Sequence, residues 1–373
     1  MSEIKVDTIV DAAGTGKPNF SNGITVNGAA TSTLNLGEYN ASSSEPSSPQ
    51  NGSVWWDTTN EVIKIYIAGE WKETVGVSSF AWGGTRGIVF LGFTTTVVNN
   101  IDYFDISSAS NAADFGDLTE ISFVPSAASD ASRVLRFGGY NVSTNYQNTI
   151  DYITPSSLGN ATDFGDLTHN VWKGSGLGDG TYGIHGGGTD SGGKSNVIEY
   201  VTVQTTGNSQ DFGDLTSGRD SLAASNDATR GLFAGGTTGS DSNIIDYITI
   251  ASTGNATDFG DLLSATQSLS ATGDTTRVVI GGGHTGLITN VIQYVTTQTT
   301  GNATDFGDLL GGSYGLSACS DGTTACFAGG YNESSQAQNI IQNITIQTTG
   351  NASDHGDLTN ASRQGAASSG NAS

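Results

Sequence analysis

The chain has 373 residues, more than twice the roughly 150 expected of one domain, which indicates several domains or one large repeat array. Its 36 acidic residues outnumber 13 Lys and Arg, and the net charge of −23 excludes nucleic acid and anionic membrane surfaces as expected partners. No apolar stretch is long enough for a membrane helix, and the start, MSEIKVDTIVD, lacks the pattern of a signal peptide, so we expect no export signal. Helix-forming residues are scarce, whereas Thr, Ser, Gly, Asn, Ile and Val dominate, which predicts an all-β fold.

The amino-terminal sequence predicts two small parts. Residues 1–35 have few large apolar side chains and a turn signal at Asn27-Gly28, which indicates an extended arm that folds against a partner. Residues 36–78 comprise a linker-like stretch at 46–53 and a small β-module with three of the five tryptophans, Trp55, Trp56 and Trp71. So short a sheet buries too little apolar area to be stable alone, so we expect these rings to pack on the arm, on the following domain or on another subunit of a homo-oligomer.

Residues 1–76 resemble segments of virion structural proteins of tailed phages that infect marine bacteria, especially cyanobacteria. MSEIKVDTIVDAAGTGKPNFSNGITVNG is similar to an amino-terminal virion-attachment segment, and NGSVWWDTTNEVIKIYIAGEWKE is similar to a β-module of tail fibres. The resemblance implies a fibre-like virion appendage, with a trimer favoured, that is assembled in the host cytoplasm and docks to other virion proteins through residues 1–76.

The rest of the chain is repetitive. DFGDL starts at residues 114, 163, 211, 258 and 305, and DHGDL starts at residue 354, at intervals of 49, 48, 47, 47 and 49. A second marker keeps the same step: Tyr103, Tyr152, Tyr200, Tyr247, Tyr294 and Asn343. Each unit contains four strand-like runs, such as SLAAS, RGLFAGG, NIIDYITI and NATDFGDL. Six such units predict a six-bladed β-propeller over residues 79–373, because neighbouring blades cover each other's apolar faces.

Two candidates for the innermost strand of the first blade stand at opposite ends of this array, at 79–83 and 363–370. We predict that residues 363–373 pair into the blade that contains 86–118, displacing or flanking 79–83, because this closure removes an open sheet edge.

The repeats resemble the kelch family in the double glycine of FAGG (233–236), in NIIDYITI and in DFGDLTSGR. The resemblance implies a kelch-like propeller and specifies no ligand. The chain departs from the family pattern in its fourth-strand Phe, where Trp is usual, and in Leu91-Gly92, which replaces the first double glycine.

Several catalytic motifs are matched only in part, and we expect no enzyme activity. AAGTGKP (12–18) has Asp11 and Pro18 where a Walker motif needs Gly and Ser or Thr. GGSYG lies between expected strands rather than at the strand-to-helix turn of a nucleophile elbow. DFG recurs without the other parts of a kinase, and the histidines have no spacing for zinc: His169, His185, His284 and His355.

Two aspartates per unit recur in the expected fourth strand, and we interpret them as structural residues whose side chains accept turn N–H bonds. No cofactor is expected, and Ca²⁺ is the alternative that these oxygen ligands admit. The residues are Asp114, Asp117, Asp163, Asp166, Asp211, Asp214, Asp258, Asp261, Asp305, Asp308, Asp354 and Asp357.

Two other recurring features have a structural interpretation. Cys319 and Cys326 are expected to face each other across the first hairpin of the sixth unit, with packed thiols favoured over a disulfide. The glycosylation sequons that start at residues 160, 255, 302 and 351 recur with the repeat, so we interpret them as turn sequences.

The segments after the double glycines differ from unit to unit: 140–148, 189–196, 237–243, 284–290 and 331–339. In an up-and-down blade these loops emerge on the same face as the connections to the next blade, which include 167–175. Aromatic side chains there can stack on sugar rings or anchor a protein contact, and the candidates are Tyr140, Tyr146, Trp172, His284 and Tyr331. Simple solvated loops are the alternative.

These observations favour a non-enzymatic virion protein, a tail fibre or similar appendage, whose propeller binds a host-surface glycan or protein or a virion partner. A capsid decoration or head-fibre protein is the alternative in the same setting. A glycan-processing enzyme is the alternative from another class; it would need paired carboxylates in the channel, whereas the repeat aspartates are expected in the outer strands.

Overall fold

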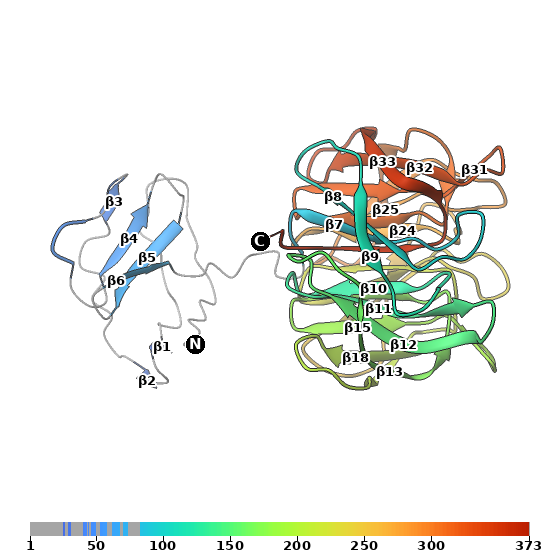
Figure 1. Cartoon of the computed structure of the whole chain (residues 1–373), viewed down its shortest axis with the longest axis horizontal. Coiled ribbons are helices and arrows are strands. Elements are labelled where there is room, and N and C mark those ends of the chain that lie inside the picture. The colour runs from blue at the N-terminus through green and yellow to red at the C-terminus, as the bar shows by residue number, and fades with distance from the viewer. Residues whose placement is uncertain are drawn as a thin grey trace. The chain divides into compact units, whose positions relative to one another are not determined.

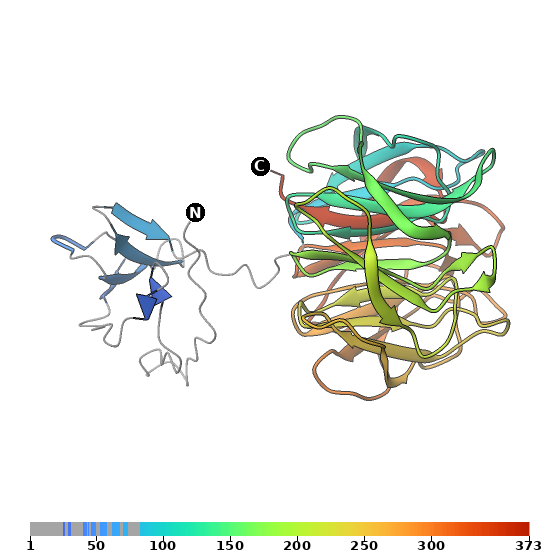
Figure 2. The ribbon, with the colours of Figure 1, turned by 90° about the horizontal axis from the view of Figure 1, so that it is seen from below.

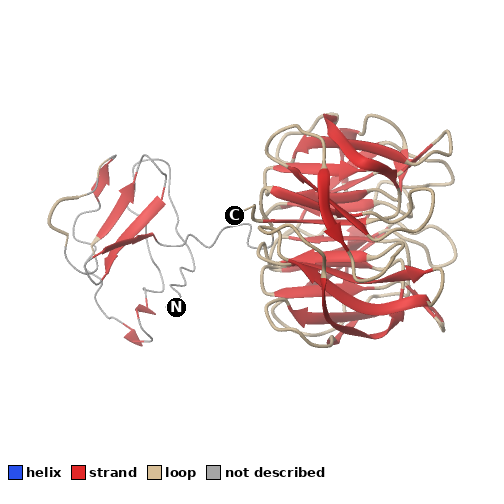
Figure 3. Cartoon of the chain, viewed as in Figure 1, coloured by secondary structure: helices blue, strands red, loops and turns tan. Residues whose placement is uncertain are grey.

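The computed structural model describes residues 83–372 and, before them, residues 25–26, 29–30, 40–42, 44, 46–49, 53–57, 62–67 and 70–73. Contacts divide the chain into two compact units, Met1–Ser79 and Phe80–Ser373. Every regular element among the described residues is a β-strand (Figure 3), so the fold is all-β as predicted. The described part of the chain holds no helix that could span a bilayer.

The first unit contains a short hairpin and a small sheet. β1 (Thr25–Val26) pairs with β2 (Ala29–Ala30), and the predicted turn signal between them lies outside the described residues. The sheet has the order β3 (Asn40–Ser42), β4 (Val54–Asp57), β5 (Val62–Ile67) and β6 (Glu70–Glu73), with β3 parallel to β4.

The aromatic residues of this sheet contact one another. Trp71 lies edge-on to Trp55 and Tyr66, with centroid distances of 5.6 and 5.4 Å, and Trp55 is buried. The sequence predicts packing of these rings on other parts of the chain or on another subunit, and this contact within the module is additional to it. The side chain of Trp56 lies outside what the structure describes.

The second unit is a β-propeller of six blades, each an antiparallel sheet of four strands (Figures 1 and 2). Blade 1 has the order β34 (Ala366–Gly370), β7 (Arg86–Phe90), β8 (Asn100–Asp105), β9 (Ala113–Asp117). Blade 2 has the order β10 (Ser126–Ser129), β11 (Val134–Asn141), β12 (Asn145–Ile153), β13 (Thr162–Val171). Blade 3 has the order β14 (Ser175–Gly178), β15 (Tyr182–Gly186), β18 (Val197–Thr202), β19 (Gln210–Asp214).

The remaining blades repeat this order from the innermost strand outward. Blade 4 comprises β20 (Ala223–Asn226), β21 (Arg230–Ala234), β22 (Ile244–Thr249), β23 (Thr257–Asp261). Blade 5 comprises β24 (Ser270–Gly273), β25 (Arg277–Gly281), β26 (Val291–Thr296), β27 (Thr304–Asp308). Blade 6 comprises β29 (Ser317–Ser320), β30 (Thr324–Ala328), β32 (Gln338–Thr345), β33 (Ser353–Ser362). Two short strand pairs lie outside the blades: β16 (Thr189–Asp190) with β17 (Gly193–Lys194), and β28 (Ser313–Tyr314) with β31 (Tyr331–Asn332).

The apolar side chains lie between blades. Within residues 83–372 they form six separate clusters, one at each interface between neighbouring blades. Between blades 4 and 5, for example, Ile245 and Phe259 of one blade pack with Val278 and Ile280 of the next. Stability therefore depends on every blade having both neighbours, as expected of a propeller.

Blade 1 is completed by the last strand of the chain. β34 pairs antiparallel with β7, from Ala366 opposite Phe90 to Gly370 opposite Arg86. In Figures 1 and 2 this red strand lies beside the blue-green strands of blade 1. This is the pairing predicted for 363–373, and it gives β7 a neighbour on both sides. Residues 79–82 of the other candidate strand lie outside the described residues.

The DFG motif is explained by the contact between each fourth strand and the next blade. In blade 4 the register slips between Ile245 and Asp246, so Phe259 is an extra, bulged residue whose ring enters the core. Gly260 has a φ of 150°, and a Cβ there would lie 2.4 Å from the carbonyl oxygen of Gly301. Blade 6 uses His355 instead of Phe, and its Nε2 lies 2.8 Å from the carbonyl oxygen of Asp105 in blade 1.

An asparagine at each interface bonds to the same motif, and we call this contact the asparagine latch. The N–H of Asp214 donates to Oδ1 of Asn255 at 3.1 Å. The other latches are Asp117–Asn160, Asp166–Asn208, Asp261–Asn302, Asp308–Asn351 and Asp357–Asn111. The second aspartate of each motif therefore uses its backbone. The sequence predicts that the carboxylates of these motifs accept turn N–H bonds. In the structure, the aspartates whose side chains accept turn N–H bonds are in the first hairpins of the blades: Asp130, Asp179, Asp227, Asp274 and Asp321.

Candidate functional site

The variable loops and the connections between blades meet on one face of the propeller. In each blade, the residue directly after the double-glycine position pairs by backbone bonds with a residue that precedes the first strand. The pairs are Phe93–Arg363, Tyr140–Phe123, Thr189–Trp172, Thr237–Asp220, His284–Gln267 and Tyr331–Tyr314. The prediction that both kinds of segment emerge on one face is therefore confirmed. We call it the paired-loop face.

Aromatic side chains form a connected arc on this face. Trp172 stacks on Tyr146 with centroids 5.7 Å apart and an interplanar angle of 15°, and it contacts Tyr140 at 5.2 Å. From Trp172 the arc continues through Phe123 to Phe93 at centroid distances of 6.4 and 5.8 Å.

The arc then crosses to blades 6 and 5. The Arg363 guanidinium lies 4.9 Å from the ring centroid of Phe93 and 4.3 Å from that of Tyr331. Tyr314 contacts Tyr331 at 5.5 Å and His284 at 6.0 Å. All five candidates named from the sequence, from Tyr146 to His284, thus belong to one half-buried aromatic arc. Blade 4 interrupts it, because Asp220 and Thr237 occupy the corresponding pair.

An open cleft lies at the blade 2 end of the aromatic arc. It is lined by Tyr140 and Tyr146 together with polar residues, including His169, Asn170 and Asp190. The segments predicted as loops are partly strand here, because β11 extends to Asn141, β12 starts at Asn145 and β13 extends to Val171. Trp172 stacks against Tyr146 but is not itself in the cleft lining, so its role is to hold the tyrosine rings.

Buried polar groups support this face from beneath. Each third strand has one buried polar residue, and its side chain accepts a hydrogen bond from the preceding blade. The donor is the residue directly after the DFGDL or DHGDL motif of that blade. The acceptors are Asp102, Asp151, Glu199, Asp246, Gln293 and Gln342. Asp151 pairs with Arg136, and Asp246 pairs with Arg219 at 2.6 Å. Asp102 accepts bonds from Thr359, and burial raises its pKa despite these bonds.

In blade 3 two histidines, His169 and His185, lie near the buried third-strand residue Glu199. His169 Nδ1 lies 3.4 Å from Oε1 of buried Glu199. His185 Nδ1 lies 2.8 Å from the hydroxyl of Ser126, and burial lowers the pKa of His185 to about 4, against the opposing effect of Glu199. His185 occupies the position of Phe233 in blade 4, and Gly174 leaves room for its ring, since a Cβ there would lie 2.3 Å from His185 Cε1. His185 is therefore a neutral core residue at pH 7.

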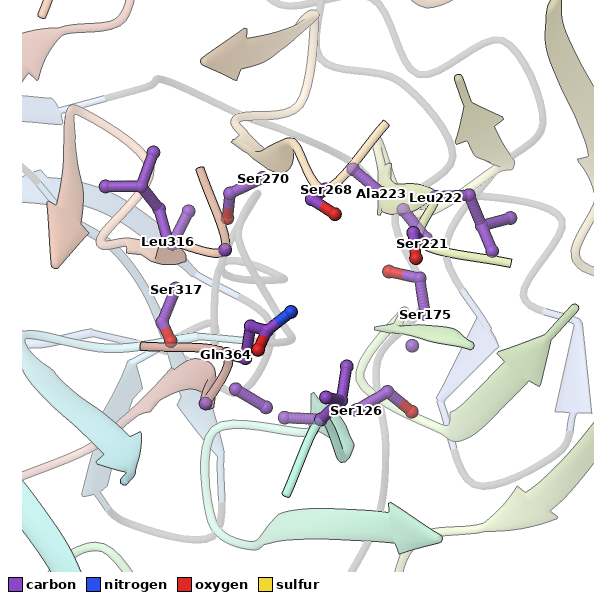
Figure 4. A pocket seen from close by; sticks show the side chains of 18 of the residues that line it. Ser126, Ser175, Ser221, Leu222, Ala223, Ser268, Ser270, Leu316, Ser317 and Gln364 are labelled. Carbon is purple, nitrogen blue, oxygen red and sulfur yellow. The ribbon is translucent and has the colours of Figure 1, made fainter. Parts of the chain in front are cut away.

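A channel opens at the centre of the propeller, with a cavity of about 100 Å³ at its mouth (Figure 4). At the mouth, one residue from each blade interface adopts a positive φ between 51 and 65°: Val124, Lys173, Ser221, Ser268, Gly315 and Gln364. The N–H of each donates to the carbonyl oxygen of the preceding member at 2.7 to 3.2 Å, and Val124 donates to Gln364. The six residues thus form a closed hydrogen-bonded ring, which we call the mouth ring.

Four residues of this face were missed by the sequence analysis: Phe93, Phe123, Tyr314 and Arg363. Three of them occupy the register of Trp172, the residue before each mouth-ring position, at residues 123, 314 and 363. Aligning the repeat units on the position of Trp172 would therefore have identified these three residues from the sequence. Phe93 and Arg363 are 270 positions apart in sequence, so their contact depends on ring closure.

The cysteines, a possible metal site and Ser313 are the other candidates for chemistry. Cys319 and Cys326 are opposite each other in the first hairpin of blade 6 as buried free thiols, as predicted, and burial raises the pKa of both. Among the described residues, no group of three or more His, Cys, Asp and Glu could hold a metal ion. Ser313 lies in β28, where it pairs with Asn332.

Comparison with models of known protein families gives no match, and comparison with curated proteins gives none either.

Proposed function

We propose that the chain is a non-enzymatic binding protein that holds a glycan on the paired-loop face, as the ligand-binding part of a virion appendage. The observation that carries the proposal is the open cleft, where the Tyr140 and Tyr146 rings lie beside the polar groups of His169, Asn170 and Asp190. Aromatic rings bind the apolar faces of sugars, and the polar groups supply hydrogen bonds to sugar hydroxyls.

Rigidity of the cleft supports this function. Tyr146 is stacked on Trp172, Tyr140 packs on both, and Lys173 lies over the Trp172 ring with its Nζ 4.2 Å from the centroid. Rings fixed in this way lose little conformational entropy when a ligand binds, which favours affinity.

The repeat offers matched variants for the test. Tyr140→Thr introduces the residue that blades 3 and 4 carry at the corresponding position, Thr189 and Thr237, so the fold accepts it. On an array of host-surface glycans, we expect the full chain to bind and Tyr140→Thr to weaken binding about tenfold, the effect of roughly 1.4 kcal/mol. Thr237→Ala on blade 4 is the control and should stay within about twofold of the parent. No binding to any glycan, or equal binding by Tyr140→Thr, would contradict a glycan-binding cleft.

The virion setting rests on the resemblance of residues 1–76 and needs its own experiment. Immunogold labelling of intact particles with an antibody to the propeller should place gold at fibre or tail tips. Gold over the head would favour a capsid decoration protein, and unlabelled particles would remove the virion assignment while leaving the binding test unaffected. Turnover of a bound polysaccharide by the full chain would instead favour the glycan-processing alternative.

A further inference from the structure

The mouth ring places a small set of side chains at the centre of the paired-loop face. Each mouth-ring residue directly follows a residue of the paired positions, as Lys173 follows Trp172 and Gln364 follows Arg363. The ring therefore borders the aromatic arc on its axial side. Because all six ring N–H groups donate within the ring, ligand recognition at the mouth falls to side chains.

The polar side chains at the mouth, Ser, Gln and Lys, can all donate hydrogen bonds. The Gln364 amide and the Ser268 hydroxyl extend toward the opening, and Ser270 and Ser317 line the same pocket (Figure 4). Lys173 belongs to the same lining, and its Nζ lies 4.2 Å from the centroid of the neighbouring Trp172 ring. The Ser221 hydroxyl donates to Asp220 at 3.0 Å, so it contributes less to a ligand.

Lys173 differs from the other cations of the propeller in its partners. Within residues 83–372, two arginines are buried against aspartates, and Lys194 pairs with Asp220 at 2.7 Å. Four more arginines lie over the repeat tyrosines of their own blades and donate to backbone carbonyls: Arg86, Arg133, Arg230 and Arg277. Arg363 lies between Phe93 and Tyr331. Lys173 contacts the Trp172 ring through its Nζ. Among residues 83–372, no carboxylate oxygen lies within 4 Å of that Nζ.

We infer that the mouth of the channel is a binding site for an anionic group, a carboxylate or a sulfate, bound by Lys173, Gln364 and Ser268. Such a group accepts hydrogen bonds from all three donors, and charge-assisted bonds are about twice as strong as neutral ones. This inference rests on the proposed function in one respect: the anionic group belongs to an acidic glycan whose sugar rings lie on the aromatic arc. An acidic ligand is favoured here even though the whole chain carries a charge of −23, because the local donor set decides recognition at short range.

The test uses the full chain with ¹⁵N-labelled tryptophan and glutamine, and adds sodium sulfate or sodium glucuronate against sodium chloride at equal ionic strength. With five tryptophans in the chain, the Trp172 indole signal is identified by its loss in Trp172→Phe. We expect saturable shifts of the Trp172 indole and Gln364 side-chain signals with both anions and not with chloride. Shifts confined to exposed surface signals, or shifts that do not saturate, would overturn the site.

The repeat supplies the variants. Lys173→Ser introduces the residue that Ser221 and Ser268 place in the same backbone conformation, so the ring remains intact. It should weaken anion binding at least tenfold. Lys194→Gln makes the same change of net charge on the same face and should leave anion binding within about twofold. An unchanged response in Lys173→Ser would contradict a role for this ammonium.

Moving the charge separates an axial site from a local effect on Trp172. In Lys173→Ser combined with Ser268→Lys, the ammonium returns to the mouth from a position two blades away from Trp172. Recovery of anion binding would support a site on the channel axis. Failure to recover, in a variant with parental stability, would show that Lys173 acts only through its contact with Trp172.

The outcomes also separate this site from the glycan proposal. If a glycan binds equally well in its carboxylated and methyl-esterified forms, the anion site is refuted and the glycan-binding arc stands. If sulfate and glucuronate bind but no glycan does, the mouth site stands and the glycan proposal fails.

Discussion

At the scale of single residues, Val124 holds a backbone conformation that its side chain disfavours. Its φ is 51°, and the same mouth-ring position in blade 6 is Gly315, with a φ of 65°. A β-branched residue in this region costs about 1–3 kcal/mol, whereas the freedom of glycine in the unfolded chain costs about 0.5–1 kcal/mol. We therefore expect Val124→Gly to raise the free energy of unfolding by about 1 kcal/mol, as measured by urea denaturation.

The reverse substitution is the control for this prediction. Gly315→Val introduces the strain that Val124→Gly removes, and a Cβ at residue 315 would lie 2.7 Å from Cγ of Gln364. Gly315→Val should therefore be less stable than the parent. If the Val124→Gly chain is no more stable than the parent, the positive φ of Val124 does not destabilise the fold.

Buried carboxylates at one position of the third strand differ in their partners, and the same substitution should therefore have opposite effects. Burial raises the pKa of Asp102, so folding favours its protonated form. Its ionised form opposes folding above the folded-state pKa, and this penalty disappears as the pH falls toward the unfolded-state pKa. Asp102→Asn should raise the free energy of unfolding at pH 7 by about 1 kcal/mol, and the gain should shrink in acid.

Asp151 is the matched comparison. Its carboxylate pairs with Arg136, and both side chains are fully buried. Asp151→Asn leaves the guanidinium charge without its counter-charge, so it should lower the free energy of unfolding by about 3 kcal/mol. Thermal denaturation of both variants at pH 7 and pH 4.5 measures the contrast. Destabilisation by Asp102→Asn at pH 7 would mean that the Thr359 bonds outweigh the cost of burying the charge.

At the scale of elements, the asparagine latch makes each fourth strand depend on the next blade. Asn255→Ala removes the acceptor of the Asp214 N–H, a solvent-accessible bond, so we expect a loss of about 0.5–1 kcal/mol in the free energy of unfolding. Thr257→Ala, two residues further along at the start of β23, is the control and should change stability by less than about 0.5 kcal/mol. Equal effects of the two substitutions on urea denaturation would show that the latch contributes nothing specific.

The whole propeller depends on closure by β34. Removal of residues 366–373 takes away the innermost strand of blade 1 and leaves β7 with an open edge that faces Ala366 and Ala367 in the intact chain. We expect this chain to aggregate and to lose its single cooperative thermal transition, because an unpaired edge invites pairing with other chains. Removal of residues 371–373 alone leaves β34 intact, so this chain should elute from a size-exclusion column at the same volume as the parent. A well-folded 1–365 chain would show that blade 1 does not need the strand.

Most of the architecture could be predicted from the sequence because each unit repeats the same four strands. The step of 47 to 49 residues fixes the number of blades, and the surplus first strand predicts that 363–373 closes blade 1. The shared face of the variable loops followed from the up-and-down order of strands. These features depend on periodicity, which a single sequence reveals directly.

The interactions that differ between blades could not be predicted in this way. Arg136 and His185 replace apolar residues at the position of Phe233, and only the structure shows that Asp151 and Glu199 lie beside them. The mouth ring was not foreseen, because Val, Lys and Gln rarely adopt a positive φ and their bonds join residues from neighbouring blades. The aromatic arc likewise needs contacts across the closure, where sequence separation gives no signal.

The closure also decides how the propeller responds to a pulling force. Gly84, which precedes β7, lies beside β34, with its N–H 3.4 Å from the hydroxyl of Ser369. Tension applied to the chain before β7 therefore enters a strand that is bonded on both sides, to β34 and to β8, over five residue pairs each. Such a strand cannot be peeled away one bond at a time from a free edge. It must shear two ladders together, so the propeller resists tension through the middle of a sheet.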